Sequence, residues 1–385
     1  MIRFLFVNLP FSSHVNPTPD LVRELTQAGH HVTYVLAKEL HEQLEGTGAA
    51  LVPYDNYDSE WLEARRYVVS FERAYETAKC VGKEKDFDCL VHEAVFVFGN
   101  QLAEDLNLPR VRFFSTFAFN HGVLDRILET GGVHFNLFEN GNPIYKLLNG
   151  YFDHVKGMMQ SSDVMNEIAD HVPDLNITYT SRELQYLSDQ FDEERFYFVG
   201  PPINEVAVET AAFDWEQMTR PIIYIAMGTM IDRFSKAIYD ACFEALADAD
   251  VTVIASVGDL EDSFDELPEN VFVYSRVPQI DVLRHVDLFI THGGMNSVNE
   301  AIYAGVPMLV NPIVNDQIVI AEQIEHLNIG KRLDLKDASS HDIRTAVFNL
   351  LSSESIASHI QKESQNMQSL GGNEKVAELI IDYMQ

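Results

Sequence analysis

The chain has 385 residues, 46% of them hydrophobic and 22% charged, which is typical of a folded globular protein with room for two domains. Its 59 acidic and 27 basic residues give a formal net charge of −32. Such a surface repels a phosphate backbone and anionic lipid, so we expect no nucleic-acid partner and no membrane partner. A small anion can still bind where donors converge locally.

The cysteines and the N-terminal residues indicate in which cellular compartment the protein is expected. Cys80, Cys89 and Cys242 lack metal-ligand spacing, which predicts free thiols in a reducing cytosol and no bound metal. Residues 2–9 are apolar, but the run is short, ends at Pro10 and lacks the basic stretch and cleavage site of a signal peptide. No apolar run reaches the roughly 18 residues that span a bilayer. We therefore expect a cytoplasmic protein without a membrane span.

The first half of the chain begins with a βαβ pattern. Residues 2–9 have the length of a buried strand, and the loop PFSSHVNP follows them. Residues 18–29 carry apolar side chains at helical spacing and end at Gly29, and residues 31–37 read as the next strand. Repetition of such units predicts a parallel, doubly wound sheet. Further elements are expected as strands at 88–92 and 110–115 and as a helix that includes 101–106.

The middle of the chain is less regular. Residues 118–170 are rich in aromatics, glycine and asparagine, and we interpret them as an insertion that shapes an apolar pocket, although the same aromatics would also suit a core. Pro201 and Pro202 mark a boundary, and a polar linker follows. We predict domains at 1–205 and 220–370, joined by a linker at 206–219.

The second half repeats the pattern of the first. Strands are expected at 221–228, 251–258, 271–275, 287–292 and 307–312, with helices at 236–247, from 279, at 296–304 and at 317–327. Residues 371–385 are predicted to form a C-terminal helix. Two doubly wound domains of this kind bind ligands at the carboxyl ends of their strands, in the cleft between them.

The segment from Asp287 to Pro307 is the strongest local signal. An apolar strand runs into His292, Gly293 and Gly294, and a helix is predicted to start near Asn296. Glycines let the backbone approach a ligand, and a helix start offers free N–H groups and a positive dipole end. These features suit a diphosphate. On the residues alone, a glycine turn with an ordinary N-cap explains the segment equally well.

Longer motifs decide between these interpretations. The chain carries in order PFSSHVNPTPDLVRELTQAGHHVTY, FYFVGPPINE, AMGT and PENVFVYSRVPQIDVLRHVDLFITHGGMNSVNEAIYAGVPMLVNPIVNDQ. These resemble the motifs of GT-B nucleotide-sugar glycosyltransferases, and most closely the bacterial macrolide-glycosyltransferase branch, whose members act on antibiotics, flavonoids and other phenols. The resemblance spans nearly the whole chain. It implies two Rossmann-like domains that face a cleft, with the acceptor in the first and the donor in the second.

The resemblance also assigns donor-site residues. Arg276 stands where some members have a tryptophan that packs on uracil, and its guanidinium would stack there instead. Val277 and Gln279 match positions that read the base. The phosphate side is matched by Thr229, His292, Gly294, Asn296 and Ser297, the ribose by Glu300, and the sugar hydroxyls by Asp316 and Gln317.

His14, in the loop after the first strand, matches the family's general base. A histidine titrates near neutral pH and suits this task, although a lone loop histidine is more often structural. The family has a glycine before it where this chain has Ser13, which would narrow the backbone conformations available. Its usual aspartate partner aligns with Glu93, which is one methylene longer. Asp88 is the alternative partner, and a solvated strand-end acid is the plain alternative for Glu93.

These observations predict an inverting, metal-independent glycosyltransferase that moves a hexose to a hydroxyl of a small hydrophobic acceptor. The expected donor is UDP-glucose, a co-substrate, with no bound cofactor, and other UDP-hexoses or dTDP-sugars stay open. The acceptor is expected to be a flavonoid, phenol or macrolide, and the protein a monomer or weak homodimer. Two rivals stay open, a nucleotide-sugar epimerase of this fold and a catalytically weak UDP-binding protein. The C-terminal helix, by resemblance, packs back on the first domain.

Overall fold

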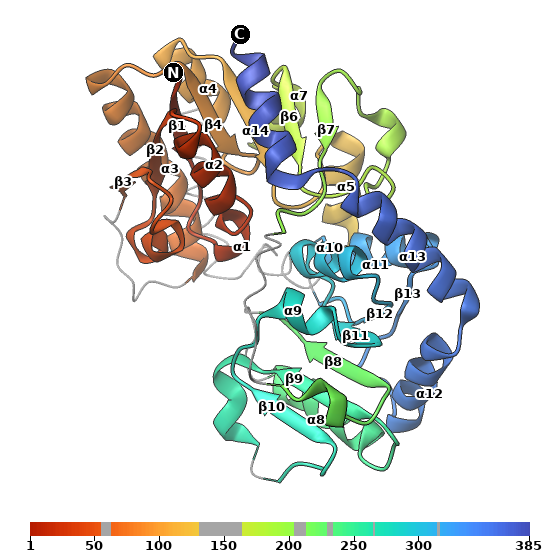
Figure 1. Ribbon diagram of the computed structural model, residues 1–385. Coiled ribbons are helices and arrows are strands. Elements are labelled where there is room, and N and C mark those ends of the chain that lie inside the picture. Colours follow the sequence, from red (N-terminus) through yellow and green to blue (C-terminus); the bar gives the residue numbers. More distant parts are fainter. Residues whose placement is uncertain (55–62, 131–163, 204–212, 229–233, 265, 314–315) are drawn as a thin grey trace, which may run out of the picture. The chain divides into compact units, whose positions relative to one another are not determined.

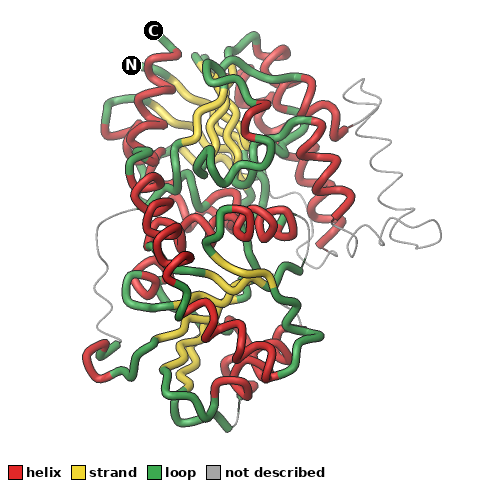
Figure 2. The backbone as a smooth tube through the Cα atoms, turned by 90° about the vertical axis from the view of Figure 1, so that its right-hand side faces the viewer, coloured by secondary structure: helices red, strands yellow, loops and turns green. Residues whose placement is uncertain are grey.

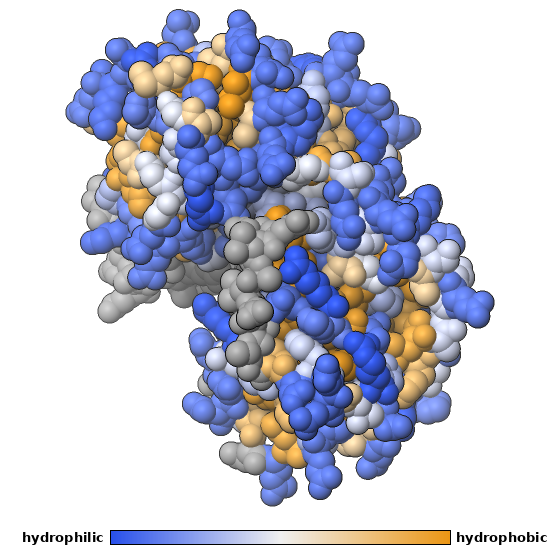
Figure 3. Space-filling model, in the orientation of Figure 1, coloured by the Kyte–Doolittle hydropathy of each residue, from blue (hydrophilic) through white to orange (hydrophobic). Residues whose placement is uncertain are grey.

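The structure is a computed structural model that describes residues 1–385 except 55–62, 131–163, 204–212, 229–233, 265 and 314–315. The chain divides into two compact units (Figure 1). One consists of Met1–Pro202 with Leu370–Gln385, and the other of Ile203–Ser369. Each contains a parallel sheet flanked by helices (Figure 2), so the predicted α/β class with two doubly wound domains is confirmed. The face drawn in Figure 3 is largely hydrophilic, in keeping with the net charge.

The first unit is built on a seven-stranded sheet of order β3-β2-β1-β4-β5-β6-β7. Its strands are parallel, and Val7 at the end of one pairs with His92 near the end of its neighbour. The strand order reverses between these two, which is where parallel sheets of this type place their ligands. The strands are β1 (Arg3–Val7), β2 (His31–Leu36), β3 (Ala50–Pro53), β4 (Cys89–Glu93), β5 (Arg110–Phe114), β6 (Leu175–Thr178) and β7 (Phe196–Phe198).

The helices of the first unit cover both faces of this sheet. Leu21, Val22 and Leu25 of α2 are buried on one side of that helix, and Gly29 just beyond it has a φ of 86°. The described helices are α1 (Ser12–Val15), α2 (Pro19–Gln27), α3 (Glu63–Glu84), α4 (Gly99–Leu106), α5 (His121–Thr130), α7 (Val164–Asp170) and α14 (Gly372–Tyr383), with 3-10 turns at η1 (Lys38–Leu44) and η3 (Ser188–Gln190).

The C-terminal helix α14 belongs to the first unit although the second unit precedes it in the chain. It packs against α2 and β6. Val376 and Ile380 are fully buried in the same core as Phe4, Phe6 and Leu25. The first unit is therefore closed by residues that follow the second.

The second unit repeats the architecture with a six-stranded parallel sheet of order β10-β9-β8-β11-β12-β13. Its order reverses between β8 and β11. The strands are β8 (Ile222–Ala226), β9 (Thr252–Ser256), β10 (Val271–Tyr274), β11 (Leu288–Thr291), β12 (Met308–Val310) and β13 (Gly330–Arg332). The helices are α8 (Phe234–Leu246), α9 (Gln279–Leu283), α10 (Met295–Ala304), α11 (Gln317–His326), α12 (Ser340–Leu351) and α13 (Glu354–Gln368), with 3-10 turns at η4 (Trp215–Gln217) and η5 (Gly258–Ser263).

All the strands predicted from apolar runs are present, with ends that shift by at most two residues. Several described elements were not predicted, among them β3, α3, β13, α12 and α13. The two strands are short and partly exposed, and the helices carry many charged and polar side chains, so their apolar periodicity is weak. Much of the predicted insertion, 131–163, lies outside the described residues.

The three cysteines are free, as predicted. Cys89 and Cys242 are buried in the cores of the two units, and Cys80 is exposed. Over the ranges that the structure describes, no helix is long and apolar enough to cross a membrane.

Candidate active site

His14 lies in the short helix α1, the first helix after the carboxyl end of β1. Its side chain is 22% exposed, and its ring centroid is 5.3 Å from that of Phe11. Ser13 precedes it within the helix and is not among the described non-glycine residues with positive φ. The serine that replaces the family's glycine therefore adopts a conformation open to any residue, and the expected restriction does not arise.

Glu93 ends β4, next to β1 in the sheet, and is buried. Its Oε1 atom lies 3.2 Å from Nδ1 of His14, so the structure brings the predicted pair together. The carboxylate is held from two other sides, because Oε2 accepts from the Val95 amide at 2.7 Å and Oε1 from the Ser115 hydroxyl at 3.2 Å. The contact with His14 is not aligned as a hydrogen bond. Catalytic contacts of this kind commonly tighten only when substrate binds.

The alternative partner, Asp88, lies at the other end of β4. It accepts from the backbone amide and the guanidinium of Arg3, each at 2.8 Å. The Arg3 guanidinium also lowers the pKa of the Asp88 carboxyl. Asp88 therefore bonds to Arg3 at the amino-terminal end of β4, remote from His14.

His92 precedes Glu93 in the strand and faces the opposite side of the sheet. Its ring is buried against α4, where a Cβ atom on Gly99 would lie 2.2 Å from it. Burial holds the pKa of His92 well below its usual value, so this histidine is neutral. It does not share a site with His14.

A buried polar network behind His14 was not predicted. Asn8 donates to the His14 carbonyl oxygen at 2.9 Å and to the Tyr34 hydroxyl at 3.1 Å, and Tyr34 contacts the Thr18 hydroxyl at 2.9 Å. The signal available in the sequence was the presence of polar residues within apolar strands, because buried polar groups require partners. Thr18 and Tyr34 also belong to the opening motif.

In the second unit, the turn between β11 and α10 depends on glycine. Gly293 has a φ of 86°, and a Cβ atom there would lie 2.7 Å from Val310. Gly294 is the N-cap residue, and the helix begins at Met295, one residue before the predicted start. The start of this helix, which carries Asn296 and Ser297 in its first turn, follows the carboxyl end of the strand beside the sheet's reversal point. This is the position and the polarity that suit a phosphate.

His292 is enclosed by two glycines. A Cβ atom would lie 2.7 Å from its ring at Gly228 and 2.5 Å from its Nε2 atom at Gly294. Burial lowers the pKa of His292 to about 4, so the ring is neutral at physiological pH. A neutral imidazole has one N–H to donate, and the backbone of Ala226, whose hydrogen bond opposes the fall in pKa, competes with a bound anion for it.

Gln279, at the start of α9, contacts two of the other predicted donor residues. Its amide nitrogen donates to the Ser297 hydroxyl at 3.0 Å and to the Glu300 carboxylate at 2.6 Å. Its carbonyl oxygen accepts from the Tyr224 hydroxyl at 3.3 Å. Burial raises the pKa of Glu300, and the bond from Gln279 opposes that rise. The Gln279 side chain thus orients the carboxylate predicted to bind ribose, a contact that was not predicted.

Of the remaining predicted residues, all but one are described. Gln317 starts α11 and accepts from the Ile313 amide at 2.9 Å, with Asp316 as the N-cap residue, and the Gln317 carbonyl lies 3.7 Å from a Cβ built on Gly293. Arg276 is exposed between β10 and α9, and Val277 beside it is partly buried. Thr229 lies outside the described residues.

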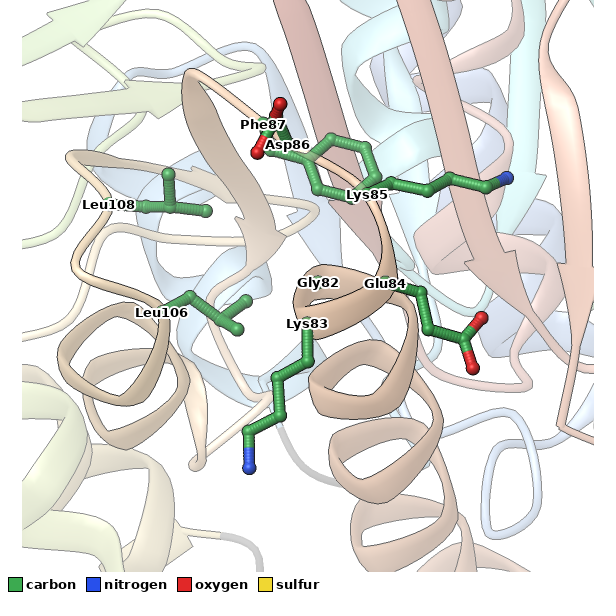
Figure 4. A pocket seen from close by; sticks show the side chains of 8 residues that line it. All are labelled: Gly82, Lys83, Glu84, Lys85, Asp86, Phe87, Leu106 and Leu108. Atoms are coloured by element: carbon green, nitrogen blue, oxygen red, sulfur yellow. The ribbon is translucent and has the colours of Figure 1, made fainter.

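Two pockets of the first unit lie near the amino-terminal ends of its strands. One, of about 220 Å³, is formed by residues 82–87 with Leu106 and Leu108, and Lys83 and Lys85 point in different directions around it (Figure 4). The other, of about 580 Å³, includes Arg110 and Tyr383. Both adjoin the starts of β4 and β5, whereas His14 and Glu93 follow strand ends. Neither pocket belongs to the candidate site.

Comparison with known proteins identifies the family. The family model described as UDP-glucoronosyl and UDP-glucosyl transferase matches residues 204–367. The NDP-glycosyltransferase YjiC of Bacillus licheniformis is 30% identical over 399 residues, which cover 98% of this chain and 96% of the relative. The chain belongs to the UDP-glycosyltransferase family. It is a glycosyltransferase, as the opening and donor motifs predicted.

Two further matches cover this glycosyltransferase from end to end. An uncharacterized UDP-glucosyltransferase, YojK of Bacillus subtilis, is 27% identical over 99% of this chain and 97% of its own. The crystal structure of the glycosyltransferase of kitacinnamycin superposes with a TM-score of 0.83 at 25% identity, over 99% of this chain and 98% of the other. The fold is that of the GT-B glycosyltransferases, as expected.

Proposed function

We propose that this glycosyltransferase transfers glucose from UDP-glucose, with inversion, to a hydroxyl of a small aromatic or polyketide acceptor, and that His14 is the general base. The observation that carries the proposal is the 3.2 Å approach of Glu93 Oε1 to His14 Nδ1, at adjacent strand ends of the first unit. A carboxylate on Nδ1 favours the tautomer that carries its proton there. Nε2 is then the atom that accepts a proton.

The chemistry follows from that tautomer. Nε2 of His14 removes the proton of the acceptor hydroxyl as its oxygen attacks the anomeric carbon, and the bond from that carbon to the diphosphate breaks. Glu93 stabilises the imidazolium that forms. A single displacement from the face opposite the leaving group inverts the configuration at the anomeric carbon.

We assign donor binding to the second unit and acceptor binding to the first. The N-terminus of α10 and neutral His292 offer donors to the departing diphosphate, which supports catalysis without a metal ion. In the described part of the chain, no group of three or more metal-ligating side chains is arranged to hold an ion. Activity that persists in a chelator is expected, and activity lost there and restored by Mg²⁺ would contradict this part of the proposal.

UDP-glucose is proposed as donor because Glu300, which accepts a hydrogen bond from Gln279, is the proposed acceptor for ribose hydroxyls, and because Asp316 and Gln317 match the family's sugar-binding pair. The name of the Bacillus subtilis relative, a UDP-glucosyltransferase, supports the same donor. Arg276 is the proposed stacking group for the base.

The test is a screen of phenols, flavonoids and macrolides with UDP-glucose, read by mass spectrometry and by acceptor-dependent release of UDP. A glucosylated product with inverted anomeric configuration is expected for at least one acceptor. Transfer only from another nucleotide sugar would refute the donor assignment. Binding of UDP without turnover on any acceptor would refute the catalytic proposal.

A further inference from the structure

The backbone around His14 has little stability of its own. Helix α1 has only four residues, and short helices are unstable without tertiary support. Within the turn, the Asn16 amide bonds to the Ser12 carbonyl and the Thr18 amide to the Val15 carbonyl. The His14 carbonyl is bonded instead by a side chain from the preceding strand end, that of Asn8.

Asn8 follows the last residue of β1 and is fully buried. Its amide bonds to the Val35 carbonyl at 3.2 Å, which continues the pairing of β1 with β2. Its own carbonyl accepts from the Tyr54 hydroxyl, and its side-chain oxygen accepts from the Leu9 amide, each at 2.8 Å. With these atoms fixed, the side-chain nitrogen has two protons to donate, one to His14 and one to Tyr34.

The hydrogen bond from Asn8 to Tyr34 is the first of a series, and the last bond of that series determines which atom donates in each. The Thr18 hydroxyl donates to the Val15 carbonyl at 2.8 Å, so the Tyr34 hydroxyl must donate to Thr18. Asn8 therefore donates to Tyr34, Tyr34 to Thr18, and Thr18 to Val15. The carbonyls of His14 and Val15, consecutive in α1, are both reached from Asn8. Asn8, Tyr34 and Thr18 are buried, and burial raises the pKa of Tyr34 to about 12, so its hydroxyl keeps its proton.

We propose that Asn8 is a positioning residue for His14, and that Tyr34 and Thr18 fix its orientation. The inference rests on the proposed function of His14 as general base. It accounts for Thr18 and Tyr34, members of the opening motif that make no contact with the reaction. Misplacement of a catalytic group by about 1 Å is enough to cost roughly 100-fold in rate.

The test compares Asn8→Leu, Tyr34→Phe and His14→Ala on two acceptors of similar size. One is a phenol already ionised at the assay pH, and the other is a hydroxyl that stays neutral and needs the base. For Asn8→Leu we expect kcat to fall about 100-fold on the neutral acceptor but only a few-fold on the ionised one. For Tyr34→Phe we expect a smaller fall in kcat, again larger on the neutral acceptor than on the ionised one. UDP affinity should stay unchanged in both variants.

Tyr75→Phe is the matched control, because that hydroxyl contacts Asp105 and Lys79 rather than the α1 turn. It should leave both rates near those of the wild type. If Asn8→Leu does not fold, as judged by Tm and circular dichroism, Tyr34→Phe carries the test.

Two failures are distinguishable. If kcat of His14→Ala falls equally on both acceptors, the assignment of His14 as general base is wrong, and the positioning inference is wrong with it. If His14→Ala spares the ionised acceptor while Asn8→Leu and Tyr34→Phe lose equally on both, only the positioning inference is overturned.

Discussion

The His14 region of the first unit and the α10 region of the second differ in how far apart in sequence their contacting residues lie. Around His14, side chains from Asn8, Tyr34, Glu93 and Ser115 meet through contacts that join four strands. In the second unit, Gln279 of α9 contacts Ser297 and Glu300 of α10, the next helix along the chain, and glycine backbone shapes the turn between β11 and α10. The first region thus depends on buried side chains, and the second on a local turn.

The comparison predicts that variants of the two regions affect different steps. Changes in the His14 region should lower turnover and leave UDP affinity intact. Changes around α10 should lower UDP affinity. A variant that alters the wrong step would show that the division between the units is wrong.

His14→Ala should have the largest effect. Loss of a general base lowers kcat on a neutral hydroxyl by about 1,000-fold, while the Kd of UDP measured by titration calorimetry stays within about two-fold. A variant that turns over at the wild-type rate would show that another group takes the proton.

Glu93→Gln should lower kcat by about 100-fold, because an amide cannot stabilise the imidazolium that forms on His14. Glu93→Asp keeps the charge but draws it back by one methylene, away from both the Val95 amide and His14. Its rate should fall between those of the wild type and Glu93→Gln. Equal rates for the two variants would mean that the position of the charge, rather than its presence, is decisive.

The buried ring of His292 predicts a loss of stability in acid. Its pKa is about 4 in the folded protein against 6.5 ordinarily, so the unfolded chain binds more protons between these values. The stabilisation is complete above pH 6.5 and declines as pH falls toward 4, by about 2 kcal/mol at pH 5. Denaturant titrations from pH 8 to pH 5 should show it. His292→Gln should weaken the decline, and an unchanged decline would exclude His292 as its source.

Gly294→Ala should have the smallest effect. Gly294 has a φ of −65° and a ψ of 139°, which alanine adopts freely, so the only conflict is with Nε2 of His292 at 2.5 Å. We expect UDP affinity to fall about tenfold, or about 1.4 kcal/mol, with kcat little changed. In a His292→Ala background the same substitution should lower UDP affinity little further. A loss of equal size in both backgrounds would locate the conflict elsewhere.

The features that could be predicted from the sequence are those whose residues are contiguous in the chain. Apolar runs predicted the two sheets, and the turn at His292–Gly294 was predicted to within one residue, because its signal lies in contiguous residues. The approach of Glu93 to His14 was expected only from the family resemblance. The link from Asn8 through Tyr34 to Thr18 was not predicted, because it depends on the register of β1 with β2, which single-sequence periodicity does not specify.

The most direct test of the central claim is a double-mutant cycle between His14→Ala and Glu93→Gln, measured as kcat on a neutral hydroxyl acceptor. If Glu93 acts through His14, Glu93→Gln should slow the wild-type enzyme about 100-fold but change the His14→Ala variant by less than about threefold. A full 100-fold loss in both backgrounds would show that the two residues act independently, and would contradict the assignment of His14 and Glu93 as one catalytic pair.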